Sequence, residues 1–133
     1  MKKRTNGSAR KRKHKQERIK RWETSGIHIG SQNVAGISLL KVYMILGTHT
    51  LDVLCLQETW LTKSAVTLDI PGYQVFEQRR DTGKRGGIAI IVRNGIKVIR
   101  HIGNEFSQGV CLQVHGGEKL WVGNVYMPPT QNL

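Results

Sequence analysis

The sequence contains little cysteine and no long hydrophobic run, and both absences narrow the class of protein. Its two thiols, Cys55 and Cys111, lie far apart and each sits among apolar neighbours. Two such residues provide neither a disulfide framework nor a zinc site, so we expect buried free thiols. No apolar stretch is long enough to span a membrane, and the N-terminus lacks the apolar segment of a secretory signal. We therefore expect a soluble, intracellular protein without a membrane partner.

Acidic residues are also scarce, and the excess of basic residues is concentrated at the N-terminus. The 133 residues include 21 Lys or Arg and 9 Asp or Glu, which gives a formal charge of +12. Residues 1–22 hold 11 of the basic side chains and one acid, Glu17, whereas the remainder is nearly neutral. Such a segment repels itself and buries little apolar surface, so residues 1–24 are predicted to form a disordered tail.

The tail carries two clusters of basic residues, and the denser one includes Lys11, Arg12 and Lys13. Clusters of this kind neutralise nucleic-acid phosphates or serve as a nuclear import signal. The predicted partners are therefore DNA and a nuclear import receptor, and the predicted location is the nucleus. The alternative is a solvated tail that has no specific partner.

Residues 53–56 form an apolar run that ends at two polar residues, Gln57 and Glu58. Such a run is typical of a buried strand, and side chains at the end of a buried strand point into a cleft. Glu58 is therefore a candidate for a working carboxylate, because Mg2+ is commonly held by one or two carboxylates together with phosphate oxygens. The alternative is that Glu58 caps the strand or pairs with an arginine.

The residues around this strand predict a strand, helix, strand unit. Residues 27–33 alternate as in a half-buried strand that ends at Asn33. Ser38 is the expected helix N-cap and Gly47 the expected C-terminal stop. Between them runs an apolar stripe that is expected to pack against the core: Leu39, Leu40, Tyr43, Met44 and Leu46. If the two strands are parallel, Asn33 and Glu58 lie at the same edge of the sheet.

The remainder of the chain predicts further strands and a basic loop. Strands are expected at 73–77, 87–93, 96–102, 110–114 and 120–126, and Asn94-Gly95 predicts a hairpin between two of them. The polar loop 78–87 could reach a phosphate backbone, or could simply be solvated, through Arg79, Arg80, Lys84 and Arg85. With about seven strands and one helix, the predicted fold class is a β-rich α/β fold.

Three short motifs each place a polar residue at the expected end of a strand. They are Gln32-Asn33-Val34-Ala35-Gly36, Leu56-Gln57-Glu58-Thr59-Trp60 and Asn124-Val125-Tyr126-Met127-Pro128-Pro129. A glycine-led strand, Gly86-Gly87-Ile88-Ala89-Ile90, lies between the second and the third. This ordered set resembles the endonuclease/exonuclease/phosphatase family of metal-dependent phosphodiesterases. The resemblance implies a two-sheet α/β sandwich of the DNase I-like type.

Within that family, the sequence is most similar to the endonuclease domain of non-LTR retrotransposons, which nicks target DNA. Thr59-Trp60, Pro128-Pro129 and the lack of an acid at Ala35 suit this branch, because the abasic-site repair branch typically has Asp there. The resemblance implies a catalytic set of Asn33, Glu58 and Tyr126. Glu58 would be a ligand of Mg2+ or Mn2+, Asn33 would orient the metal site and the phosphate, and Tyr126 would hydrogen-bond the phosphate. The implied partner is DNA.

The resemblance extends from residue 27 to about residue 130, and two further family motifs are missing. A Gly-Asp-x-Asn motif, which carries the general base, and a later Ser-Asp-His segment do not occur. Residues 25–133 are therefore expected to be the N-terminal half of a domain, with one sheet and half a core. Such a half would leave an apolar sheet face uncovered. We expect it to be inactive alone.

Two alternatives stay open. A small basic nucleic-acid-binding protein without catalysis would bind through its tail and use the folded part as a scaffold. A lipid or inositol-phosphate phosphodiesterase of the same family is disfavoured by the basic tail and by Thr59-Trp60.

Overall fold

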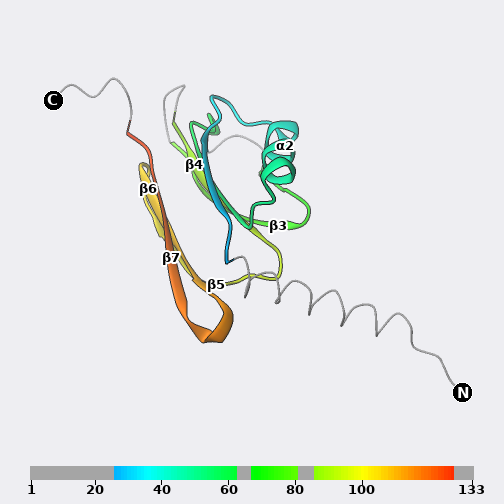
Figure 1. Ribbon diagram of the computed structural model, residues 1–133. Helices are drawn as coiled ribbons and strands as arrows, with labels where there is room; N and C mark the ends of the chain where they lie inside the picture. The colour runs from blue at the N-terminus through cyan, green and yellow to red at the C-terminus, as the bar shows by residue number, and fades with distance from the viewer. Residues whose placement is uncertain (1–25, 63–66, 81–85, 128–133) are drawn as a thin grey trace, which may run out of the picture.

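The structure, a computed structural model, describes residues 26–62, 67–80 and 86–127 (Figure 1). Within these ranges it contains seven strands, one α-helix and one short 3-10 helix, so the predicted β-rich α/β class is confirmed. In chain order the elements are β1 (Ile29–Asn33), α2 (Leu39–His49), β2 (Val53–Gln57), β3 (Tyr73–Gln78), β4 (Ile88–Arg93), β5 (Lys97–Gly103), β6 (Ser107–Gln113), η1 (His115–Gly117) and β7 (Lys119–Val125). The predicted tail, residues 1–24, lies outside the described residues.

Two sheets pack face to face, and helix α2 covers the outer face of the larger one (Figure 1). The larger sheet has four strands in the order β1-β2-β4-β3, and the smaller has three in the order β5-β6-β7. Strands β2 and β4 are buried on both faces, which explains their continuous apolar runs. The expectation of a single sheet was therefore wrong, because the strands after β4 form a second sheet.

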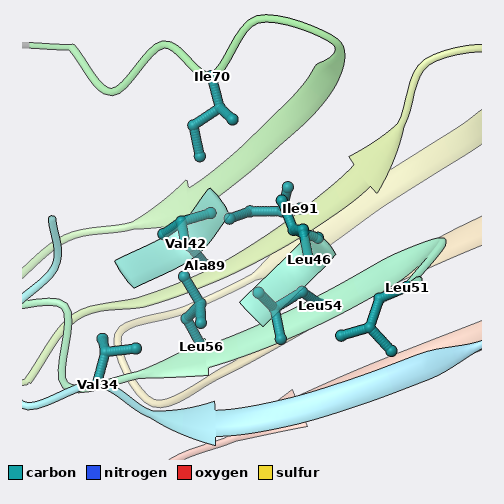
Figure 2. Close-up of a cluster of buried hydrophobic side chains, with 9 residues drawn as sticks. All are labelled: Val34, Val42, Leu46, Leu51, Leu54, Leu56, Ile70, Ala89 and Ile91. Atoms are coloured by element: carbon teal, nitrogen blue, oxygen red, sulfur yellow. The ribbon is translucent and has the colours of Figure 1, made fainter. Parts of the chain in front are cut away.

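Two hydrophobic clusters fill the spaces between these layers. Successive residues of β2 and β4 point to opposite faces, so each strand contributes to both clusters. Figure 2 shows the first cluster, in which Val42 and Leu46 of α2 pack against sheet residues such as Leu54 and Ile91. The second cluster lies between the sheets and contains Val53, Cys55, Ile90, Val92, Ile96, Val110, Leu112 and Val122.

Helix α2 begins as predicted and ends later than predicted. Ser38 Oγ accepts a hydrogen bond from the backbone N–H of Lys41 at 3.2 Å, which confirms the N-cap. Gly47 lies inside the helix, and the C-cap is Thr50, a left-handed residue with φ 51° whose N–H donates to Leu46 O. The helix continues past the glycine because the chain turns only where the next residue, Leu51, enters the core.

The apolar stripe predicted to face the core is mostly exposed. The buried helix residues are Val42 and Leu46, whereas Leu40 and Met44 are 71% and 61% exposed. Leu40 and Met44 each lie two positions before a buried residue, which places them about 200° away around the helix axis. The prediction was wrong because the helix carries apolar residues on both sides, and only one side contacts the sheet.

The Asn94-Gly95 turn connects the two sheets and does not form the predicted hairpin. Strand β4 pairs with β2 on one side and β3 on the other, whereas β5 pairs with β6. Because both edges of β4 are already occupied, the return strand has no place beside it. Ile96 enters the cluster between the sheets directly after the turn, and the chain continues into the second sheet.

The outer face of the smaller sheet is the uncovered apolar face. Among the described residues, Ile102, Trp121 and Val125 are exposed on this sheet, and no described helix packs against it.

Both thiols are buried and unbridged, as expected, and burial raises the pKa of Cys55 to about 11. Within the described residues, no helix combines the length and the apolar character needed to cross a membrane.

Candidate active site

The candidate site lies at one edge of the four-stranded sheet, where three strand ends meet. Strands β1 and β2 are parallel, with Asn33 opposite Gln57, so Asn33 and Glu58 lie at the same edge as predicted. Strand β4 runs antiparallel to β2 and starts at this edge, with Ile88 opposite Gln57. The sequence order strand, helix, strand therefore places two of the three motifs side by side.

Tyr126 reaches this edge from the other sheet. Its phenolic O–H donates a hydrogen bond to Glu58 Oε1 at 3.0 Å, which joins two motifs 68 residues apart. The backbone N–H of Tyr126 donates to Phe106 O at 2.9 Å and holds the residue just after β7. Of the two Glu58 carboxylate oxygens, only Oε1 is engaged by the described residues. The structure thus brings Glu58 and Tyr126 into direct contact.

Asn33 is held in a turn beside Glu58. Its Oδ1 accepts a hydrogen bond from the backbone N–H of Ala35 at 3.1 Å, which forms an Asx turn. Ala35 and Gly36 both have positive φ, 43° and 98°. The backbone N–H of Gly36 donates to Glu58 O at 2.8 Å and fixes this turn against the end of β2. The position of Asn33 is therefore set by the same backbone that carries Glu58.

The backbone at Glu58 and Trp60 is strained, with φ of 54° and 62°. Non-glycine residues rarely adopt this region, and the cost of about 1–3 kcal/mol per residue is most often found at functional sites. The N–H groups of Thr59 and Trp60 donate to the carbonyls of Gly87 and Gly86 at 3.1 and 2.8 Å. A Cβ at Gly87 would collide with Thr59 Oγ1, so this close approach requires glycine.

A network of buried amide side chains lies behind the tyrosine–glutamate hydrogen bond. Asn124 is 2% exposed, and its Nδ2 lies within 3.1 Å of three acceptors: Leu56 O, Ala89 O and Gln108 Oε1. Its Oδ1 accepts a hydrogen bond from Gln57 Nε2 at 2.8 Å. Asn124 therefore connects the two sheets immediately below the site.

Gln108 extends this network to a histidine. Its Nε2 lies 3.2 Å from both Phe76 O and His101 Nε2. Because an amide nitrogen only donates, His101 Nε2 accepts this hydrogen bond in its neutral form. Burial lowers the pKa of His101, which favours that neutral form.

Neither this amide network nor the exposure of Trp60 was predicted from the sequence. For Gln108 and Asn124, the sequence offered one indication of a buried network, namely a polar residue at an inward-facing position of a strand. That signal does not identify their partners, because Leu56 and Ala89 belong to the opposite sheet.

The basic residues predicted to contact nucleic acid are only partly described. Arg79 donates through Nε and Nη2 to the two carboxylate oxygens of Glu77, at 2.9 and 3.1 Å. Arg80 Nε donates to Glu105 Oε1 at 2.9 Å. Both charges are thus partly offset within the chain, and their phosphate contacts stay a prediction. The other residues of this prediction lie outside the described residues: Lys11, Arg12, Lys13, Lys84 and Arg85.

Comparison with models of known protein families identifies the family of this chain. The model of the endonuclease/exonuclease/phosphatase family matches residues 30–129, which include all three motifs. The chain belongs to the endonuclease/exonuclease/phosphatase family. The comparison with curated proteins found no match.

Solved structures of this fold include two AP endonucleases. AP endonuclease LMAP from Leishmania major has a TM-score of 0.54 at 20% identity, over 74% of this chain and 38% of that chain. The Xenopus laevis APE2 catalytic domain has a TM-score of 0.58 at 18% identity, over 77% and 46%. The 3′ phosphatase NExo from Neisseria, solved with a product DNA hairpin, has 0.46 at 21%, over 74% and 40%. This chain therefore spans less than half the length of these proteins, and the first two confirm its DNase I-like fold.

Enzymes of the endonuclease/exonuclease/phosphatase family generally depend on a divalent metal. Within residues 26–62, 67–80 and 86–127, no group of three or more His, Cys, Asp or Glu is placed to hold one. The oxygen donors available at the site are those of the Glu58 carboxylate, a hard ligand that suits Mg2+ or Mn2+, because Asn33 Oδ1 already accepts the Ala35 N–H. This donor set fits an ion that takes further oxygens from a phosphate and water, and it does not form a protein-only cage.

Proposed function

We propose that this chain is the N-terminal part of a metal-dependent phosphodiesterase that nicks target DNA, as the endonuclease of a non-LTR retrotransposon does. The observation that carries the proposal is the 3.0 Å hydrogen bond from Tyr126 to Glu58. It unites side chains from two sheets and two family motifs at one edge, beside strained backbone. Strained backbone of this kind is found mostly at active sites and ligand-binding sites.

In this proposal each residue at the site has a separate task. Glu58 holds Mg2+ or Mn2+ through its carboxylate, and the ion supplies positive charge against the phosphoryl oxygens. Asn33 donates a hydrogen bond to the phosphate through Nδ2, because its Oδ1 is occupied by the Asx turn. Tyr126 has a single phenolic proton, which it donates to Glu58 here, so it must turn this O–H toward the phosphate when substrate binds.

Ala35 supports the retrotransposon branch over the repair branch. It lies in the Asx turn with φ 43°, a conformation that Asp tolerates better than Ala. The backbone conformation would therefore accept the Asp that is typical of repair enzymes, yet position 35 is Ala. Without an acid at position 35, the turn brings no second carboxylate to Glu58. We propose that the chain does not act at abasic sites.

The metal role of Glu58 is tested by Mn2+ binding, measured through proton relaxation of the solvent. We expect Glu58→Gln to weaken binding, because an amide has no negative charge to hold the ion. The matched control is Glu118→Gln, an exposed carboxylate that follows η1 and should leave binding unchanged. Equal Mn2+ affinity in the wild type and Glu58→Gln would contradict the proposal.

We further propose that the chain alone has negligible nuclease activity. Asn33, Glu58 and Tyr126 can bind and orient a phosphate, but they supply no general base for water, and losing the base and imidazole costs several powers of ten in rate. Plasmid nicking is the measurement, with Mg2+ present and absent. Mg2+-dependent nicking by the purified 133 residues would overturn this part of the proposal.

The second candidate function, a basic nucleic-acid-binding protein without catalysis, is favoured by the concentration of 11 basic residues in positions 1–22. In that case, deletion of residues 1–22 abolishes DNA binding and flattens its salt dependence, and Glu58→Gln has no effect on metal or phosphate binding. Nuclear localisation is proposed on the same segment, and fusing residues 1–24 to a fluorescent reporter tests it.

A further inference from the structure

Trp60 combines an exposed indole with a fixed backbone at the active-site edge. It lies two residues after Glu58, and the residue is 45% exposed. A large aromatic side chain with φ 62° is unusual, because the left-handed region is unfavourable for bulky residues. The fold therefore holds a hydrophobic ring in solvent, in a strained conformation, beside the candidate phosphate site.

The indole rests on a support that only glycine provides. A Cβ at Gly36 would lie 2.8 Å from Cε3 and 3.1 Å from Cζ3 of Trp60, so the six-membered ring packs directly over this glycine. The backbone N–H of Trp60 donates to Gly86 O at 2.8 Å, and Ile37 N–H donates to Thr59 O at 3.0 Å. The ring is thus held from the side of the protein and remains accessible from the side of solvent.

Other exposed aromatic residues in the described ranges do not share this placement. Trp121 is 50% exposed but lies on the outer face of the smaller sheet. Tyr43 lies on helix α2, and its hydroxyl donates to Pro71 O at 3.2 Å. Trp60 is the exposed indole that adjoins the residues proposed to bind a phosphate.

We propose that Trp60 stacks on an unpaired nucleobase next to the phosphate held at Glu58. This inference rests on the proposed function, because that function places a nucleotide phosphate at this edge. An indole face offers a flat, apolar surface that matches any nucleobase and gives no sequence preference. Stacking on one base strengthens binding by about tenfold or more. The role assigned to Trp60 is binding of substrate, with no part in the chemical step.

The test compares two fluorescent oligonucleotides by polarisation, using the full chain. One is a short single strand with all its bases, and the other has the same phosphates with abasic sugar analogues in place of the bases. Any phosphate contacts of the basic tail would strengthen both interactions equally, because the two strands carry the same phosphates. We expect the wild type to bind the base-bearing strand about tenfold more tightly. Trp60→Leu should remove this preference.

Two further variants complete the test. Trp121→Leu, at an indole of similar exposure away from the site, should keep the preference, and Trp60→Phe should retain most of it because phenylalanine also stacks. Equal wild-type binding of both strands, or a preference that survives Trp60→Leu, would overturn the inference. Failure of Mn2+ binding with an intact base preference would instead contradict the metal role of Glu58 alone.

Discussion

At the scale of single residues, the Asn124 carboxamide is the centre of the buried amide network. It hydrogen-bonds both sheets at once, since Leu56 O and Ala89 O belong to the larger sheet and Gln108 to the smaller. Buried polar groups are stabilising only when all partners are satisfied, and removing one leaves the others unpaired. Asn124 therefore fixes how the strand that carries Tyr126 sits on the strand that carries Glu58.

Replacing Asn124 with Ala should cost about 3 kcal/mol of unfolding free energy, because buried carbonyls and an amide lose their partner. Urea unfolding followed by circular dichroism measures this loss. The control is Asn94→Ala, an exposed turn residue for which we expect a change within about 0.5 kcal/mol. Equal effects of the two substitutions would show that the network does not stabilise the fold.

His101 should make stability depend on pH in a defined direction. Its pKa is lowered in the folded chain by burial, from an ordinary value of 6.5, so the unfolded chain binds the proton more tightly. The contribution of neutral His101 to the free energy of unfolding is therefore fully present above pH 6.5. It decreases as the pH falls from 6.5 to the lower pKa of the folded chain. His101→Gln, which keeps an acceptor for Gln108, should reduce this loss in urea unfolding at pH 7 and pH 5.5. His49→Gln, at an exposed helix end, should not.

At the scale of elements, sequence patterns located the strands but not their partners. The apolar run at 88–92 predicted β4, yet nothing local shows that β2 and β3 occupy both of its edges. The Asn94-Gly95 turn was real, whereas the pairing inferred from it was wrong, because pairing depends on strands distant in the chain. For α2, Ser38 acts locally and was predicted correctly, whereas the buried face depends on which side meets the sheet.

Two glycines should respond in opposite ways to substitution by alanine. Gly47 lies within α2, and nothing lies within 4 Å of a Cβ built there, so Gly47→Ala should stabilise the chain by about 0.5–1 kcal/mol. Gly87 has φ 85° and contacts Thr59, so Gly87→Ala should destabilise it by more than about 1 kcal/mol. Urea unfolding tests both, and a destabilising Gly47→Ala would contradict the helical assignment.

At the scale of the whole molecule, the sequence located the ends of strands at which polar residues gather. Asn33 and Glu58 were predictable because each lies at the C-terminal end of an expected strand and the two strands are joined by a helix, which favours parallel pairing. That Glu58 and Tyr126 belong to one site was implied only by family resemblance, and their hydrogen bond was not predicted, since it depends on how two sheets stack. The exposure of Trp60 was not predictable, because it depends on Gly36 and Gly86 from two other segments.

The exposed face of the smaller sheet should make the isolated chain associate with itself. Val125 is 67% exposed on β7, an edge strand that offers both unpaired backbone groups and apolar side chains. Sedimentation velocity should show association that increases with concentration, and Val125→Lys should reduce it because a charged edge strand resists pairing. Leu40→Lys is the control, since Leu40 is equally exposed on helix α2. If Leu40→Lys alone prevented association, the helix would be the contact surface, and the apolar sheet face would be stable in water without a cover.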